Sequence, residues 1–138
     1  MKLRNQGPIQ AAPRLEDHAG MLASTVESWP GVAAFTHWQP GSPGVVDGAE
    51  FHVGDDELGH VHLDATAHIL MGRTITSLLS RKSLGKPPSW SDAWITHPVR
   101  SPADVRHGVW LFQLAYDRLR GASEDGLLMR IAQGTGPS

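Results

Sequence analysis

The sequence predicts a two-layer α+β sandwich, in which helices pack on one face of an antiparallel sheet of about five strands. Three observations support this fold class. Apolar residues at helical spacing mark segments near both ends of the chain, short strand-like segments separated by turn residues lie between them, and no regular alternation of strand and helix occurs. The expected element order is α-β-β-β-β-α-β-α, with a short C-terminal helix after it.

The chain has 138 residues, which is the size of one domain. We expect residues 1–13 to form a flexible N-terminal tail and residues 14–121 to form a single α+β domain. Residues 122–138 are expected to be a C-terminal extension, a short helix followed by a loose tail, because glycine and proline are frequent at both ends of the chain. The apolar face of that short helix needs a partner, which is either the core or the second subunit of a homodimer.

The elements of the first half follow from apolar spacing and from turn residues. From Leu15 to Trp29, apolar or small residues recur in steps of four and three, which is typical of one face of a helix, and Pro30-Gly31 ends it. The stretch from Gly54 to Glu57 is a tight turn that joins two strands into an antiparallel hairpin. Four strands are expected in this half, over residues 32–38, 49–53, 58–63 and 67–71.

The second half holds the clearest helix signal of the chain. A helix is expected to follow Gly72 and to end near Gly85, and a strand over 94–99 comes next. Ser101-Pro102-Ala103-Asp104 then combines a hydroxyl N-cap, a proline at the first helical position and a carboxylate at the third, so a long helix begins there. A weaker cap at Ser123 predicts the short C-terminal helix.

The composition excludes several classes of protein. Lysine and arginine number 12 and aspartate and glutamate 14, and this net charge of -2 is too balanced for a protein that follows nucleic-acid phosphates. Without cysteine the chain has no disulfide, no zinc–thiolate cluster and no thiol nucleophile. No apolar run is long enough for a signal peptide or a membrane span, so we expect a cytoplasmic protein with neither nucleic acid nor membrane as partner.

The chain is rich in histidine and tryptophan, with His 8 and Trp 5. Side chains alternate between the two faces of a strand, so His60, His62 and Asp64 are expected to project together. Such a face suits a general acid–base pair, in which one imidazole reacts and the other imidazole, Asp64 or Glu57 orients it. It also suits a metal ion held by His60, His62 and Asp64. A polar strand face that simply meets solvent is the third interpretation.

The strand register decides which neighbour faces His60. If Val53 pairs with Leu58, Phe51 lies opposite His60 and adds an apolar wall, whereas a register shifted by one residue brings His52 there. The sequence leaves both registers open. The pocket beside the imidazoles is expected to be lined by Phe51, His37, Trp38, His68, Trp90, Trp94 and His97.

Several of these segments are similar to one known family. The most specific is Glu57-Leu58-Gly59-His60-Val61-His62, supported by Glu50-Phe51, Trp94 and Leu114-Ala115-Tyr116-Asp117-Arg118. Together they resemble the luciferase domain, a small bacterial and fungal family of unknown function, over roughly residues 15–120.

The chain also departs from the pattern of that family. Relatives carry a histidine before the final strand, where this chain has Pro88-Ser89-Trp90, so the resemblance implies no third family ligand or proton donor here. The order of the elements is also similar to that of the small α+β domains of the YjbR type, which share a closing helix with a tyrosine. That second similarity concerns architecture alone and implies no activity.

The residues favour a small, cofactor-independent enzyme that uses histidine-based general acid–base chemistry on a partly apolar small organic molecule, as an isomerase, cyclase, lyase or hydrolase. Two alternatives stay open. One is a non-catalytic binding module, in which His60 and His62 would tolerate substitution by glutamine while partner binding persists. The other is a mononuclear metal-binding protein that holds a divalent transition metal on the His-x-His strand.

Overall fold

The computed structural model describes residues 11–42 and 44–133 and confirms the predicted α+β class. The observed order of elements also agrees with the prediction, including the short C-terminal helix. The elements are α1 Asp17–Glu27, β1 Val32–Trp38, β2 Val46–Val53, β3 Asp56–His62, β4 Thr66–Leu70, α2 Arg73–Arg81, β5 Trp94–Pro98, α3 Pro102–Leu119 and α4 Glu124–Ala132.

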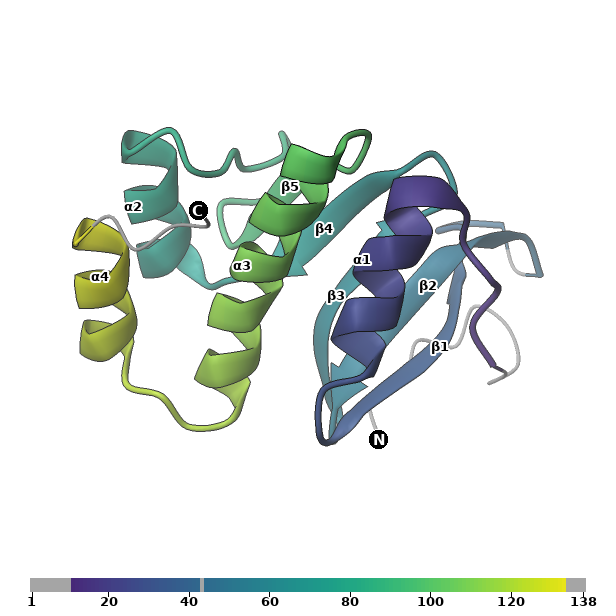
Figure 1. Ribbon diagram of the computed structural model, residues 1–138, viewed down its shortest axis with the longest axis horizontal. Coiled ribbons are helices and arrows are strands. Elements are labelled where there is room, and N and C mark those ends of the chain that lie inside the picture. The colour runs from purple at the N-terminus through teal and green to yellow at the C-terminus, as the bar shows by residue number, and fades with distance from the viewer. Residues whose placement is uncertain (1–10, 43, 134–138) are drawn as a thin grey trace.

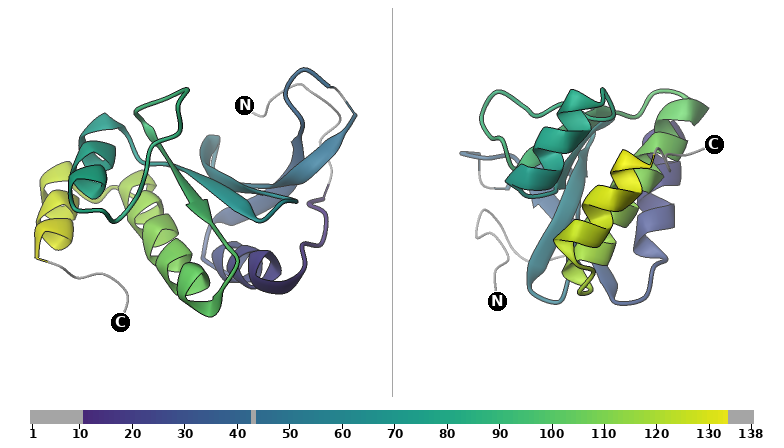
Figure 2. Two further views of the ribbon diagram at one scale, coloured as in Figure 1. Left: turned by 90° about the horizontal axis from the view of Figure 1, so that it is seen from above. Right: turned by 90° about the vertical axis from the view of Figure 1, so that its left-hand side faces the viewer.

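The five strands form one sheet in the order β1-β2-β3-β4-β5, and every neighbouring pair is antiparallel. Figure 1 shows α1 and α3 side by side on one face of this sheet, whereas α2 and α4 pack against each other at one end of the molecule. Seen from above in Figure 2, the sheet is bent, and the face away from α1 and α3 carries no helix in the described part of the chain. Four histidine side chains gather on that uncovered face.

The hydrophobic core lies between the sheet and the helices α1 and α3. Leu22 of α1, Phe51 of β2 and Phe112 of α3 are all almost completely buried there, and the rings of Phe51 and Phe112 meet edge to face with centroids 6.0 Å apart. Gly108 of α3 brings the two helices close together, since a Cβ at this position would lie 3.1 Å from a methyl carbon of Leu22. The expectation that Phe51 lines a pocket is therefore wrong, because its place on β2 turns the ring into the core.

The helix ends follow the local sequence. Ser101 adopts the extended N-cap conformation, and its hydroxyl oxygen accepts a hydrogen bond of 3.1 Å from the backbone N–H of Asp104, as the capping motif predicts. Ser123 caps α4 in the same way. Helix α2 ends at Arg81 rather than near Gly85, because Ser83 takes a left-handed backbone conformation with φ 57°.

The N-terminal end differs from the expected tail where the structure describes it, whereas the short helix of the C-terminal extension packs on the rest of the domain, one of the two expected arrangements. In the predicted N-terminal tail, residues 1–10 lie outside the described residues, but Ala11 pairs with Phe35 of β1, and its carbonyl accepts a 2.7 Å hydrogen bond from the Thr36 hydroxyl. In the C-terminal extension, Leu127 and Ile131 of α4 are buried where α4 packs on α2 and α3. None of the described helices is long and apolar enough to cross a membrane.

Candidate functional site

The uncovered face of the sheet carries a cluster of four imidazoles that come from three of its strands. His37 comes from β1, His60 and His62 from β3, and His68 from β4, directly opposite His60 in the register. We call these four residues the histidine cluster. His60 and His62 share the face because they alternate with Gly59 and Val61, which point into the core. The sequence prediction that His60 and His62 project together therefore agrees with the structure.

The rings of the histidine cluster are in mutual contact. His37 stacks on His60 with centroids 3.9 Å apart and planes 10° from parallel, and His62 meets both rings edge to face. The Nδ1 atom of His68 lies 3.0 Å from Nε2 of His62 and 3.2 Å from Nε2 of His60. Several ring nitrogens therefore converge on one small region of the sheet.

A bulge in β3 places a carboxylate behind His60. Glu50 of β2 pairs with His60 and Phe51 with Gly59, but His52 pairs with Glu57, so Leu58 is the extra residue. Without the bulge, Glu57 would share the core face with Gly59 and Val61. With it, the Glu57 carboxylate reaches the cluster and accepts a 2.7 Å hydrogen bond from Nδ1 of His60. Neither register expected from the sequence occurs, because Glu50 rather than Phe51 or His52 lies opposite His60.

A second bulge, in β2, places a carboxylate next to His62. His37 of β1 pairs with Gly48 and the next residue, Trp38, pairs with Val46, which leaves Asp47 as the extra residue of β2. The Asp47 carboxylate accepts a 2.7 Å hydrogen bond from Nδ1 of His62. Bulges that redirect a side chain toward a site are a recurring feature of sheets.

Glu50 holds the third imidazole of the cluster. One oxygen of its buried carboxylate accepts a 2.8 Å hydrogen bond from Nδ1 of His37, and the other accepts a 2.6 Å hydrogen bond from Nε2 of His52. Burial by itself raises the pKa of Glu50, but the hydrogen bonds from the two histidines outweigh it and lower the pKa to about 2. The carboxylate is therefore charged at neutral pH.

Two members of the cluster are held in the neutral form. Burial is the largest cause that lowers the pKa of His60, and it exceeds the opposing effect of the Glu57 hydrogen bond. Burial, followed by the nearby His60 and His62, lowers the pKa of His68 to about 4. Because Nδ1 of His37, His60 and His62 donates to a carboxylate, the lone pair of each neutral ring is on Nε2.

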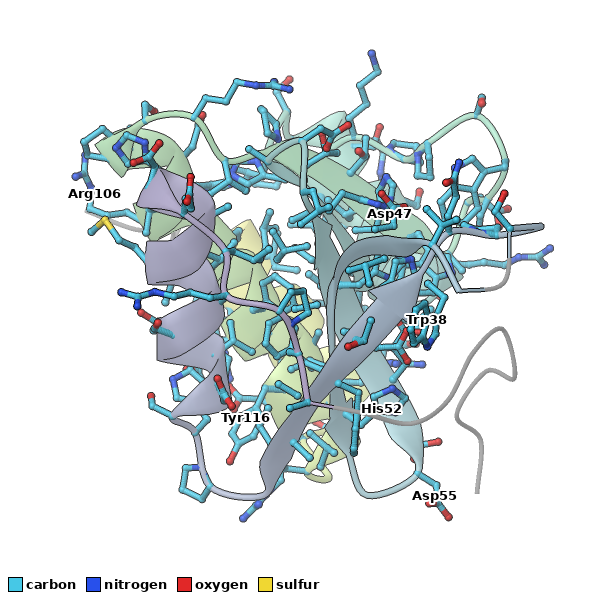
Figure 3. The ribbon with its side chains drawn as sticks, turned by 90° about the vertical axis from the view of Figure 1, so that its right-hand side faces the viewer. Trp38, Asp47, His52, Asp55, Arg106 and Tyr116 are labelled. Atoms are coloured by element: carbon cyan, nitrogen blue, oxygen red, sulfur yellow. The ribbon has the colours of Figure 1, made fainter. Side chains whose placement is uncertain are left out.

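A cavity of about 140 Å³ opens beside the cluster. Figure 3 shows Trp38, Asp47 and His52 along the strands that form this side of the molecule. The cavity is lined by His37, Trp38, Pro40, Glu50, Glu57, His60 and Trp94. Trp90, in the loop between α2 and β5, is 58% exposed and meets His68 edge-on at 5.5 Å and Trp94 at 5.8 Å. The cavity thus has a polar floor and an indole-rich wall.

The structure brings most of the expected site residues together. Glu57, His60, His62, His37, Trp38, His68, Trp90 and Trp94 all lie at the cluster or beside its cavity. Asp64 is close enough for its charge to act on His68, but it holds none of the rings, because β3 ends at His62 and the chain turns at Ala65, which has φ 68°. The Asp64 carboxylate accepts a hydrogen bond from the backbone N–H of Thr66 instead.

His97 also lies elsewhere. It is three residues after Trp94 on β5, so the two side chains project from opposite faces of the sheet. His97 is buried against α3, and its Nε2 donates a 2.8 Å hydrogen bond to the carbonyl of Asp104. The prediction that His97 lines the pocket is therefore wrong.

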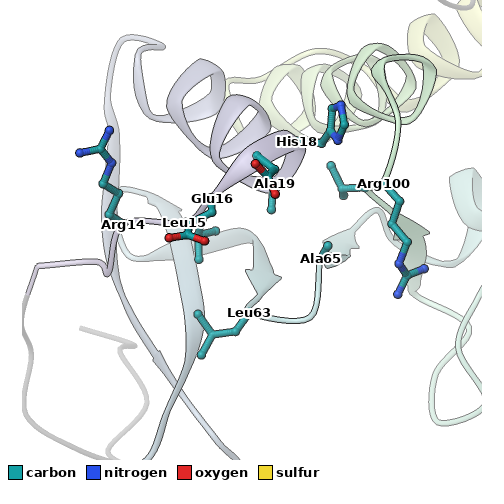
Figure 4. Close-up of a pocket in the computed structure, with 10 residues that line it drawn as sticks. Arg14, Leu15, Glu16, His18, Ala19, Leu63, Ala65 and Arg100 are labelled. Carbon is teal, nitrogen blue, oxygen red and sulfur yellow. The ribbon is translucent and has the colours of Figure 1, made fainter.

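The sequence prediction missed Asp47 and Glu50 as partners of the cluster. Glu50 alternates with His52 on the strand before the hairpin, and this pattern could have placed both on the histidine face. Asp47 gave no such signal, because its orientation depends on the bulge. A separate pocket of about 470 Å³ at the N-terminal end of α1 (Figure 4) shares none of the residues that line the cavity at the cluster.

Comparison with known proteins gives one match. No curated protein and no solved structure matches the chain. The family model of the luciferase domain matches residues 55–115, which run from the β2–β3 turn into α3 and include Glu57, His60, His62 and His68 but not His37 or Glu50. The match confirms the resemblance found in the sequence: residues 55–115, a little under half of the chain, are similar to the luciferase domain family.

Proposed function

We propose that this protein is a metal-dependent enzyme, in which His37, His60 and His62 bind one divalent transition-metal ion next to the cavity. The observation that carries the proposal is the set of carboxylates behind the three rings, since Nδ1 of each imidazole donates to its own carboxylate, from Glu50, Glu57 or Asp47 respectively. Metal-binding histidines almost always have such a partner on the other ring nitrogen, because it fixes the tautomer and aims the free nitrogen.

The donor set fits a transition metal. Imidazole nitrogen binds zinc, copper, iron and nickel, and it must be neutral to do so. The lowered pKa of His60 favours that form. Three protein ligands leave a coordination position for a substrate, as in catalytic zinc sites. A metal held there would act as a Lewis acid that polarises a substrate oxygen.

The spacing of the rings is close to that of a bound site. The ligand nitrogens of His37, His60 and His62 lie within 4.8 Å of one another. Two nitrogens at about 2.0–2.1 Å from one tetrahedral ion are separated by about 3.3–3.4 Å. Metal binding therefore requires the rings to close by on the order of 1.5 Å, and the stacked rings of His37 and His60 must also tilt so that both Nε2 atoms face the ion.

The cavity defines the kind of molecule that would meet the metal. Trp38, Pro40 and Trp94 give it an apolar wall, and its lining contains no lysine or arginine among the described residues. Glu50 and Glu57 line it as well, so an anionic substrate would face negative charge. We therefore expect a small, uncharged, partly apolar molecule with one oxygen or nitrogen that can approach the metal.

A second candidate function is general acid–base catalysis by the same residues without a metal. It is favoured by the Glu57–His60 pair, in which a carboxylate holds Nδ1 of an imidazole that lines the cavity. The lone pair of His60 is then on Nε2, which can accept a proton from a substrate once its 3.2 Å contact with Nδ1 of His68 opens. The two candidates make opposite predictions about metal dependence.

A metal titration distinguishes them. Protein purified without a histidine tag is stripped with a chelator and titrated with Zn²⁺ by calorimetry, alongside the variants His60→Gln and His62→Gln. The metal-site proposal predicts one equivalent bound by the wild type. At a free Zn²⁺ concentration of 100 Kd, binding stabilises the folded state by about 2.7 kcal/mol and raises the Tm by on the order of 10 °C.

His18→Gln is the matched control, because His18 lies on α1 at a separate pocket. This variant should bind Zn²⁺ as the wild type does, whereas His60→Gln and His62→Gln should lose tight binding. A wild type that binds no metal, or a His60→Gln variant that binds it unchanged, contradicts the metal site. The acid–base candidate then remains, and it predicts that His60→Gln removes turnover of any identified substrate.

A further inference from the structure

We propose that His68 is a fourth and displaceable ligand of this metal, which closes the coordination sphere at rest and leaves when a small molecule binds. The inference rests on the proposed metal site and adds its regulation. It names the side chain that fills the coordination position left by His37, His60 and His62, and the event that empties this position. It assigns His68 a role different from that of the three imidazoles with carboxylate partners.

The first argument is the position of the His68 nitrogen. Its Nδ1 lies 3.0 Å from Nε2 of His62 and 3.2 Å from Nε2 of His60. Two ligands at about 2.0–2.1 Å from one ion are about 2.9 Å apart at a right angle and about 3.3–3.4 Å apart at the tetrahedral angle. In the structure these contacts are hydrogen bonds donated by Nδ1–H of His68, since the lone pairs of His60 and His62 are on Nε2. Their lengths are also those between fellow ligands, so Nδ1 of His68 is placed to become a ligand when it gives up this proton to metal binding.

The second argument is how differently the rings are held. His37, His60 and His62 each donate through Nδ1 to a carboxylate at 2.7 to 2.8 Å. His68 has no hydrogen bond to a carboxylate within residues 11–42 and 44–133. Its ring can therefore rotate away without breaking a hydrogen bond to a carboxylate, which the other three rings would have to break.

The third argument is what lies against His68 on its outer side. The ring packs edge-on against Trp90, a largely exposed side chain in the loop between α2 and β5. Trp90 in turn contacts Trp94, which lines the cavity. A molecule that enters along Trp94 therefore meets the indole that holds His68 in place. This connection gives substrate entry a direct way to release the ligand.

Cobalt spectroscopy tests the proposal, because the visible spectrum of Co²⁺ reports its coordination without any turnover. The chelator-treated wild type, His68→Ala and the control His18→Ala are each titrated with Co²⁺, and imidazole is then added as an external ligand. Circular dichroism spectra of the three proteins establish that the variants are folded.

We expect His68→Ala still to bind Co²⁺, more weakly than the wild type and with a different spectrum, and imidazole to restore the wild-type spectrum. Excess imidazole should also change the spectrum of the wild type by displacing His68. An unchanged affinity and spectrum in His68→Ala would show that His68 is not a ligand. A wild-type spectrum that resists imidazole, or a folded His68→Ala that binds no cobalt, would show a fixed ligand and overturn the displaceable role.

Failure of the underlying metal site looks different. In that case the wild type binds no Co²⁺, or His60→Gln binds it as tightly as the wild type does. The effect of His68→Ala is therefore interpreted only against a wild type and a His60→Gln variant titrated under the same conditions. His18→Ala should match the wild type throughout, because His18 lies on α1 at the separate pocket.

Discussion

Replacing Glu57 by glutamine tests whether the carboxylates behind the imidazoles support metal binding. Glu57 accepts a 2.7 Å hydrogen bond from Nδ1 of His60, and the two side chains are only 17% and 9% exposed. Glutamine keeps the size and an acceptor oxygen but removes the charge, so a charge-assisted hydrogen bond becomes a neutral one of about half the strength. Loss of such a partner typically costs about 10–100-fold in metal affinity, or roughly 1.4–2.7 kcal/mol.

The assay for Glu57→Gln is a competition titration of Zn²⁺ between the protein and a chromophoric chelator at pH 7. Glu27→Gln is the matched control, since Glu27 is exposed at the end of α1 on the opposite side of the sheet. We expect the control to keep the wild-type Kd and Glu57→Gln to raise it at least about tenfold. A Glu57→Gln variant with a Kd within a factor of about two of the wild type would refute the reasoning that the carboxylate orients His60 for a metal.

Three further predictions concern the scaffold. Gly59→Ala should lower the free energy of unfolding by about 1–3 kcal/mol in urea titrations, because its Cβ would lie 2.8 Å from the ring of Phe112, and a loss below about 0.5 kcal/mol would contradict this packing. Ser101→Ala should cost about 1 kcal/mol in the same assay through loss of the cap on Asp104, whereas full stability would show that the cap contributes nothing. Burial lowers the pKa of His97, so the unfolded chain binds more protons below about pH 6.5, and stability should fall on acidification. His97→Gln should therefore show a shallower loss of stability between pH 7 and pH 5 in metal-free protein than the wild type, and equal slopes would contradict the shift.

Much of the fold could be predicted because its signals are local. The cap at Ser101 and the proline after it specify the start of α3 without reference to the rest of the chain. The apolar spacing of α1 likewise predicts which of its residues are buried, such as Leu22 and Val26. The sequence predicts the end of a helix less accurately where a backbone conformation decides it. Ser83, for example, takes a left-handed conformation and ends α2 before Gly85.

The candidate site could be predicted only as far as strand alternation holds. His60 and His62 project together because a single residue, Val61, lies between them on the strand, and this follows from spacing alone. Asp64 was placed with them on the same rule, but β3 has already ended there. Alternation is a property of paired strands, so it gives no guidance beyond the last paired residue.

The two bulges explain why the carboxylate partners were only partly foreseen. Glu57 was expected to orient an imidazole because it lies near His60 in the sequence, yet it reaches that ring only because Leu58 is the extra residue in β3. Asp47 was not foreseen, since its contact with His62 depends on a second bulge, in β2. A bulge is set by the pairing of the whole sheet, and a single strand carries no clear sign of it.

The most direct test of the metal site is diffraction from crystals of the zinc-loaded protein at the zinc absorption edge. The account predicts one anomalous peak on the uncovered face of the sheet, at about 2.0–2.1 Å from Nε2 of His37, His60 and His62. A peak at another histidine, such as His18 or His107, with none between these three rings would contradict it.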